Sequence, residues 1–378
     1  MKNFLPLSYI ELSSKNLIHN IKQFRNLVKR GTRISVAIKG NAYGHGQNEI
    51  AKILEPYVDY FQINSKEELE LLRKSSKKAV LLFGYVQKKD LAQVIKLGCI
   101  LAVFSIKHLK EIDKAAQRLN VKQTIHISVD AYLGREGVLV DELPKFLKEI
   151  KKCKFIKMTG IYAHFANIED TSDFSHAQKQ IREYQEALKL TDAFGFKNLQ
   201  THISATSGIL IYEKETGKNS LVRLGIGVYG LWPSERLGLL YRNKMELKPV
   251  LSWKTKVAQI KVLPKGRTIG YGLTYKTRKK TKIAIIPVGY ADGLDRGLSN
   301  KGEVLISGAR CKIIGRISMN MFTVDVSNLP KVEIEDEVII LGSQGKEQIT
   351  AEKMAKQIDT INYEITARIS PILPRIIV

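Results

Sequence analysis

Short apolar runs alternate with helix-like stretches between residues 34 and 226. Runs long enough to form buried strands occur at 34–38, 58–63, 79–83, 99–104, 124–129, 155–162, 199–203 and 221–226. Between them apolar residues recur every three or four positions, as at Leu143, Phe146 and Leu147, which predicts amphipathic helices. Eight strands that alternate with helices favour a (β/α)8 barrel. An open doubly wound sheet is the alternative, but no GxGxxG motif follows the first run.

The pattern changes after about residue 237. Alternating or continuously apolar runs follow at 252–263, 283–288, 304–306, 311–326 and 338–341, with glycine and proline between them. Only 350–358 has a clear helical pattern in this part of the chain. We therefore expect two domains, a barrel over residues 1–238 and a mostly β domain over residues 239–378.

The composition is typical of a globular protein, with 44% hydrophobic and 26% charged residues in a chain of 378. No apolar run approaches the roughly 18 residues of a membrane span, and the N-terminus lacks a secretory signal pattern. Cys99, Cys153 and Cys311 lie far apart without a CxxC motif, so we expect neither disulfides nor a metal site. These features predict a cytoplasmic protein with no membrane partner.

The net charge of +24 raises the alternative of a polyanion-binding protein. A local basic run at 276–282 would suit such a role. The lysines are nevertheless spread along the whole chain without interleaved aromatic residues, which is typical of a solvated basic surface. We therefore expect no nucleic-acid partner.

Candidate chemistry lies at the ends of the predicted strands. Lys39 follows the first run and precedes a glycine-rich loop, while His164, His202 and Arg223 lie at the ends of, or within, later runs. Active residues of (β/α)8 barrels cluster at the C-terminal ends of the strands. A desolvated lysine there can act as a Schiff-base nucleophile, although a solvated lysine before a turn is the ordinary alternative.

The segment Val36-Ala37-Ile38-Lys39-Gly40-Asn41-Ala42-Tyr43-Gly44-His45-Gly46 resembles the pyridoxal-phosphate lysine motif of the alanine racemases. Further segments that are similar to family motifs lie at 222–230, 269–275, 287–293, 315–320 and 361–364. The resemblance spans nearly the whole chain and both predicted domains.

The resemblance implies pyridoxal 5'-phosphate as cofactor, bound through Lys39. It implies that Arg223 meets the pyridine nitrogen and discourages its protonation, and that His164 lies nearby. Residues implied to hold the phosphate are Tyr43, Thr206, Gly225, Ile226 and Tyr363.

The resemblance also implies the reaction, which is the interconversion of L-alanine and D-alanine by two bases on the external aldimine. Lys39 would serve the D-enantiomer, and Tyr271 from the partner subunit of a homodimer would serve the L-enantiomer. Arg135 and Met319 would bind the substrate carboxylate. The D-alanine would supply peptidoglycan.

Three alternatives remain at this point. A racemase for other amino acids, such as serine or lysine, is disfavoured by the bulk of Tyr363. A fold-related decarboxylase is disfavoured by Arg223, because such enzymes keep the ring nitrogen protonated. A cofactor-homeostasis protein on the same barrel would lack the second domain that carries Tyr271 and Met319.

Two positions depart from the family pattern. Ser128 stands where the family usually has a lysine, often carbamylated, that holds the arginine at position 135. Because serine is short and neutral, we expect either a small bound anion such as chloride beside Arg135 or a less rigid Arg135. Ala205 replaces an asparagine beside the phosphate, while Thr206 keeps a hydroxyl there.

Overall fold

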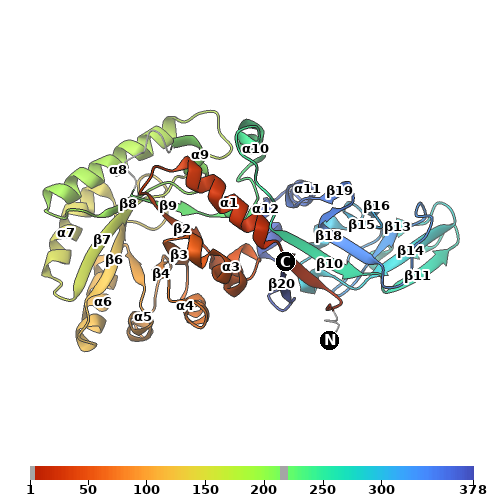
Figure 1. Cartoon of the computed structure of the whole chain (residues 1–378), viewed down its shortest axis with the longest axis horizontal. Helices are drawn as coiled ribbons and strands as arrows, with labels where there is room; N and C mark the ends of the chain where they lie inside the picture. The colour runs from red at the N-terminus through yellow and green to blue at the C-terminus, as the bar shows by residue number, and fades with distance from the viewer. Residues whose placement is uncertain (1–4, 213–219) are drawn as a thin grey trace. The chain divides into compact units, whose positions relative to one another are not determined.

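The computed structural model describes residues 5–212 and 220–378. Two compact units interleave along the chain (Figure 1). One contains Ile18–Gly40 and Ile50–Lys248; the other contains Asn41–Glu49, Pro249–Val378 and the N-terminal stretch through Leu17. These units are discontinuous in the sequence, whereas the change in the pattern of apolar runs suggests a single division at residue 238. The N-terminal stretch joins the second unit because β1 (Tyr9–Leu12) pairs with β10 (Leu251–Lys256) and β20 (Arg375–Ile377).

The first unit is a barrel of eight parallel strands, in the order β8-β7-β6-β5-β4-β3-β2-β9. Their bounds are β2 Arg33–Ala37, β3 Tyr60–Ile63, β4 Ala79–Leu82, β5 Ile100–Val103, β6 Gln123–Ser128, β7 Ile156–Tyr162, β8 Gln200–His202 and β9 Leu221–Leu224. Backbone hydrogen bonds from Ser220 N to Thr201 O (3.1 Å) and from Arg223 N to Ser204 O (3.0 Å) bring the ends of the sheet together. The predicted barrel is confirmed, and every one of the eight apolar runs forms a strand.

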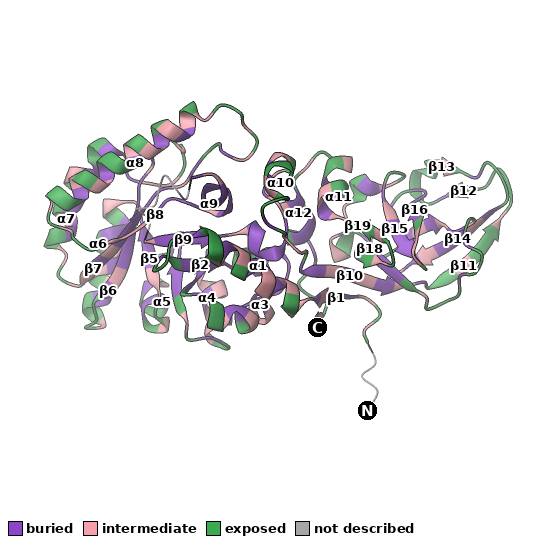
Figure 2. Ribbon diagram, turned by 45° about the horizontal axis from the view of Figure 1, so that its top comes forward, coloured by how far each residue is buried: buried purple, intermediate pink, exposed green. Residues whose placement is uncertain are grey.

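Amphipathic helices follow the strands, with buried residues on the side that packs against the sheet (Figure 2). In α7 (Leu143–Lys152) the buried residues are Leu143, Phe146, Leu147 and Ile150, which recur at the expected helical spacing. The other helices of the described chain around the barrel are α4 Lys66–Arg73, α5 Leu91–Leu97, α6 Ile106–Arg118, α8 Ser175–Ala193, α9 Thr206–Tyr212 and α10 Glu235–Tyr241. Nearer the N-terminus lie α1 Ser14–Leu27, α2 Lys39–Tyr43 and α3 Gln47–Leu54.

The second unit is mostly β, as predicted. Its larger sheet has the order β16-β15-β18-β10-β1-β20, with β19 paired to β18, and a smaller sheet has the order β11-β14-β17. Strand bounds are β11 Gln259–Leu263, β12 Thr268–Ile269, β13 Tyr275–Lys276, β14 Thr281–Ile286, β15 Glu303–Ile306, β16 Ala309–Lys312, β17 Phe322–Asp325, β18 Glu337–Gln344 and β19 Glu347–Ile349. The predicted helix is α11 (Ala351–Gln357), whereas α12 (Asn362–Ala367) was not expected from the sequence.

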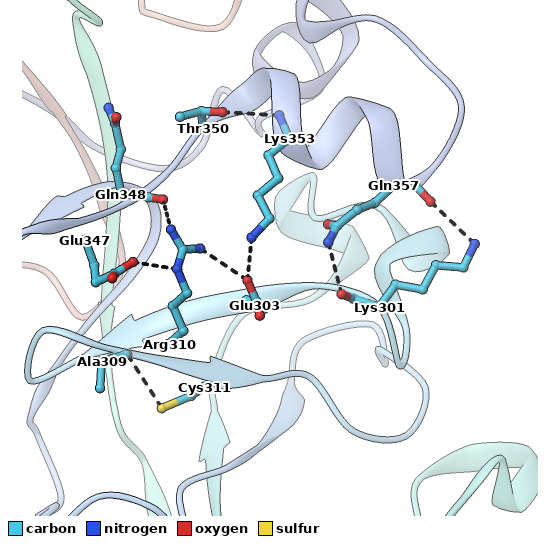
Figure 3. Close-up of polar contacts among 10 residues, drawn as sticks. All are labelled: Lys301, Glu303, Ala309, Arg310, Cys311, Glu347, Gln348, Thr350, Lys353 and Gln357. Carbon is cyan, nitrogen blue, oxygen red and sulfur yellow. Dashed lines mark hydrogen bonds and ion pairs between the residues drawn. The ribbon is translucent and has the colours of Figure 1, made fainter.

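An ion-pair network ties α11 to the sheet (Figure 3). The Glu303 carboxylate on β15 accepts hydrogen bonds from Lys353 Nζ at 2.6 Å and Arg310 Nη1 at 3.2 Å. Arg310 also contacts the Glu347 carboxylate on β19 at 2.5 Å. Because Arg310 lies on β16, the partly buried Glu303 carboxylate and its neighbours link four elements, α11, β15, β16 and β19.

Within the described residues, no helix is both long enough and apolar enough to cross a lipid bilayer.

Candidate active site

A cavity of about 360 Å³ opens among residues that follow or end the barrel strands. Its walls include Lys39 after β2, Phe83 after β4, Tyr162 at the end of β7, His164 after β7, and Arg223 on β9. Gln62, Asn64, Gly84, Tyr85, Phe104, Arg135 and Glu136 complete the lining. Of the predicted residues, the structure thus brings Lys39, Arg135, His164 and Arg223 to one cavity.

Lys39 begins a tight turn, α2, in which the backbone has left-handed geometry. The φ angles of Gly40, Asn41, Ala42 and Tyr43 are 60°, 53°, 53° and 55°. Such angles cost non-glycine residues about 1–2 kcal/mol each, so the turn needs support. Part of that support comes from Glu68 on α4, whose carboxylate accepts a hydrogen bond from Gly40 N at 2.6 Å. The lysine is thereby fixed at the end of its strand.

The Lys39 amine extends into the cavity and is accessible there. The protein around it still removes much of its hydration. Burial, together with the positive charge of Arg135, lowers the pKa of Lys39, although Glu68 and Glu136 act in the opposite direction. A larger share of the amine is therefore unprotonated, and nucleophilic, than in a solvated lysine.

Arg223 is held rigidly within the barrel. Its Nη2 donates to Ala163 O at 2.7 Å and Ile203 O at 3.2 Å, and its Nη1 donates to His202 O at 3.0 Å. The guanidinium also lies over the ring of Tyr162, 5.2 Å from its centroid. Burial lowers the pKa of Arg223 to about 10, so the group still carries its charge at neutral pH.

A row of histidines extends from Arg223. Its Nη1 lies 2.7 Å from His202 Nδ1, and its Nη2 lies 3.1 Å from His164 Nδ1. Because a guanidinium only donates, these nitrogens accept, and the proton of His202 resides on Nε2. That nitrogen lies 2.9 Å from His126 Nδ1. Burial and the charge of Arg223 lower the pKa values of His126 and His164 to about 3, which keeps both rings neutral.

The guanidinium of Arg135 is paired with the carboxylate of the next residue, Glu136. Its Nε donates to Glu136 Oε2 and its Nη2 donates to Glu136 Oε1, the latter at 2.9 Å. The expectation of a bound chloride or a less rigid Arg135 is therefore wrong, because a carboxylate of the chain itself meets the guanidinium. The available signal was the acidic residue next to Arg135 within a glycine-flanked segment.

Three of the residues predicted for the phosphate, Thr206, Gly225 and Ile226, also lie together. Thr206 Oγ1, at the start of α9, accepts hydrogen bonds from Gly225 N at 3.0 Å and Gly227 N at 3.5 Å. Ile226 is buried beside them. With two N–H groups directed at its oxygen, the Thr206 hydroxyl keeps its own hydrogen for an external acceptor such as phosphate.

Four predicted residues belong to the second unit. The rings of Tyr43 and Tyr363 lie together, with centroids 6.0 Å apart. Tyr271 and Met319 are exposed, at 73% and 55%. Their segments pack against each other, since a Cβ on Gly315 would lie 2.7 Å from the carbonyl oxygen of Ile269.

These groups fit pyridoxal phosphate. The described hydrogen bonds of Arg223 use Nη1 and Nη2, which leaves Nε–H to meet a ring nitrogen. Lys39 offers an accessible amine with a lowered pKa to an aldehyde. Thr206 offers a hydroxyl hydrogen to a phosphate.

Comparisons with known proteins agree with this geometry. The chain matches the family descriptions "Alanine racemase, N-terminal domain" over residues 12–233 and "Alanine racemase, C-terminal domain" over residues 250–377. It is 35% identical to an alanine racemase of Leptospira interrogans, over 98% of this chain and 96% of that protein.

Solved structures give the same result. The alanine racemase of Bacillus anthracis with bound L-Ala-P is 31% identical, with a TM-score of 0.92 over 99% of this chain and 96% of that one. The alanine racemase of Bartonella henselae with covalently bound pyridoxal phosphate is 27% identical, with a TM-score of 0.87 over 99% of this chain and 100% of that one.

Proposed function

The chain belongs to the alanine racemase family, and on that premise we propose that Lys39 and Tyr271 exchange the Cα proton of alanine from opposite faces. The enzyme is a pyridoxal-phosphate-dependent isomerase that interconverts L-alanine and D-alanine. When bound, the cofactor supplies an electron-withdrawing ring that accepts the electrons released as the Cα–H bond breaks. The remaining tasks fall to the side chains of this protein.

Lys39 binds the cofactor and serves as the base for the D-enantiomer. The lowered pKa of its amine suits both tasks, because the neutral form attacks an aldehyde and accepts a proton. The single observation that carries the proposal is this lysine, at a strand end, in one cavity with a fully buried arginine.

Arg223 determines the electronic state of the ring nitrogen. A guanidinium that keeps its charge, held by backbone carbonyls, donates a hydrogen bond and does not transfer its proton. Opposite this guanidinium, the nitrogen of a bound ring would stay unprotonated and the ring would withdraw fewer electrons, which would limit side reactions such as transamination. This argues against the decarboxylase alternative.

Tyr271 serves as the base for the L-enantiomer in the cavity of a partner subunit. Its 73% exposure supports a role away from its own fold, since a tyrosine used locally would be enclosed. Further large apolar side chains are exposed in its own segment and in the segments at 290 and 319–321: Leu273, Tyr290, Met319 and Met321. Such a surface is typical of a subunit interface, and we propose a homodimer with shared active sites.

The substrate carboxylate binds Arg135 and the backbone amide of Met319. Tyr43 and Tyr363, whose rings lie against each other, bind the phosphate and restrict the space for the substrate side chain to little more than a methyl group. His164, Thr206, Gly225 and Ile226 complete the cofactor site. We place the enzyme in the cytoplasm, where its three free cysteines would stay reduced, and propose that it supplies D-alanine for peptidoglycan.

Chiral product analysis tests this function. Purified protein with pyridoxal phosphate is incubated separately with L-alanine, L-serine and L-lysine, and the enantiomers are resolved chromatographically. We expect alanine to reach an equal mixture of enantiomers far faster than the others. Comparable rates for serine or lysine would instead support a broader racemase, and no conversion of any amino acid would contradict the proposal.

A further inference from the structure

The side chains that line the substrate cavity carry more positive than negative charge. Lys39, Arg135 and Arg223 are basic, whereas Glu136 is the one carboxylate among the lining residues of the described chain. Arg223 is held by carbonyls and histidines inside the barrel. Arg135 has no such enclosure, since 60% of its side chain is exposed. Its position in the cavity therefore depends on the contact with Glu136.

The geometry of that contact leaves part of the guanidinium free. Nε and Nη2 of Arg135 donate to the two carboxylate oxygens of Glu136. A paired arrangement of this kind fixes the plane of the guanidinium as well as its distance. Nη1 remains outside the pair and retains two hydrogens for another anion. Arg135 can thus hold Glu136 and a substrate carboxylate at the same time.

The backbone that carries the pair is anchored to β6. Val138 N donates to Ser128 O at 2.8 Å, and Asp130 N donates to Val138 O at 3.1 Å. The Ser128 hydroxyl also donates to Glu136 O at 3.4 Å. Gly137 allows the close return of the chain, because a Cβ there would lie 2.3 Å from Asp130 N. The Glu136 carboxylate therefore projects from a fixed point.

The charge of Glu136 persists at neutral pH. Burial alone would raise the pKa of this carboxyl, but the hydrogen bonds from Arg135, a backbone hydrogen bond and the positive charges of Arg135 and Lys39 together outweigh burial, and the net pKa is lowered. Ser128, at the end of β6, is buried, short and neutral, and cannot supply a counter-charge.

We propose that Glu136 is a positioning residue that holds Arg135 in place for the substrate carboxylate, as a counter-ion built into the loop after β6. The proposal rests on the substrate-binding role of Arg135 proposed above. Glu136 touches Arg135 and needs no contact with the substrate. Its removal should weaken binding of carboxylates more than it slows the chemistry.

The test compares Glu136→Gln with the wild type, both as holoenzyme. The amide keeps the size of the side chain but removes its charge. We expect KM for L-alanine to rise roughly tenfold, as for other residues that orient a ligand-binding group, with a smaller change in kcat and an unchanged cofactor absorbance. An unchanged KM would overturn the proposal. A lowered KM would also overturn it, because Glu136 would then compete with the substrate.

Glu149→Gln is the matched control. Glu149 also pairs with basic side chains, Lys110 at 2.9 Å and Lys152 at 2.6 Å, but it lies on α7 and outside the cavity lining. This variant should leave KM unchanged. A KM increase equal to that of Glu136→Gln would overturn the assignment, since loss of any ion pair would then have the same effect.

A binding measurement separates this inference from the proposed function. Propionate carries the carboxylate of alanine without its amine, and its dissociation constant can be measured by calorimetry. If Glu136→Gln binds propionate roughly tenfold more weakly than the wild type, the positioning role holds even where racemisation fails. Equal propionate binding by the two proteins would overturn the inference while leaving alanine racemisation intact.

Discussion

At the scale of single residues, the site depends on how each cation is held. Arg223 is enclosed and fixed by backbone carbonyls, so it can donate a hydrogen bond without moving. Lys39 is accessible in the cavity and has a lowered pKa, so it can change protonation state and form a covalent bond. Arg135 is intermediate, exposed but paired with Glu136. The three cations of this cavity therefore have three different roles: Arg223 is a fixed charge, Lys39 is a reactive amine, and Arg135 is an oriented anion-binding group.

Tyr271→Phe should affect the two enantiomers unequally. The change removes the phenolic oxygen and keeps the ring, so folding should be unaffected at this exposed position. Loss of a general base lowers a rate by about 10²–10⁴-fold, and we expect that loss in the exchange of the α-proton of L-alanine with deuterated solvent. Exchange from D-alanine should persist, because Lys39 serves that face. Equal losses for both enantiomers would contradict the assignment.

At the scale of secondary-structure elements, long-range contacts hold short elements in place. The left-handed turn after β2 is supported by Glu68 on α4, and α11 is tied to the sheet by the hydrogen bond from Lys353 to Glu303. Isolated helices as short as α11 are marginal in water, so such tertiary contacts decide whether they form.

Glu303→Gln should lower the free energy of unfolding of the second unit by about 1 kcal/mol, because its carboxylate is partly buried between two cations. Burial raises the pKa of Glu303, but the hydrogen bond from Lys353 and the charges of Lys353 and Arg310 outweigh it, and the net pKa is lowered. A lowered carboxyl pKa stabilises the fold above the unfolded value of about 4.3, and the effect is lost as pH falls through the folded value.

Urea unfolding at pH 7 and pH 3 measures this difference. The difference in the free energy of unfolding between the wild type and Glu303→Gln should be smaller at pH 3 than at pH 7. Glu333→Gln, which removes an exposed ion pair with Lys331, should have almost no effect at either pH. A difference in the free energy of unfolding that is larger at pH 3 than at pH 7 would contradict the stabilising role of Glu303.

Elements with strong patterns could be predicted from the sequence, and contacts between side chains could not. The eight barrel strands follow from continuous apolar runs, because strands buried on both faces need them. The 252–263 run divides into β10 and β11, a break that its apolar pattern does not mark. Helix α12 was missed because six residues are too few for a clear period. In the site, residue types identified Lys39 and Arg223 as candidates, but pairing of Arg135 with Glu136 depends on side-chain conformation, which sequence does not encode locally.

At the scale of the whole molecule, the proposed reaction needs two copies of the chain. The barrel unit contains Lys39, Arg135 and Arg223, whereas Tyr271 and Met319 belong to the other unit and are exposed. If the tyrosine acts in the cavity of the partner subunit, every active site contains residues from both subunits. A variant that lacks either base should then have no racemase activity by itself. Mixed dimers of the two variants should regain racemase activity.

The most direct measurement is the activity of co-expressed Lys39→Ala and Tyr271→Phe chains. With equal expression and random pairing, half of the dimers are mixed and each has one intact site of two, so we expect about a quarter of the wild-type alanine racemase activity. The two parent homodimers, shown to be folded by circular dichroism, should each be nearly inactive. Activity of the co-expressed pool no higher than the average of the parents would contradict a shared site built from Lys39 and the partner's tyrosine.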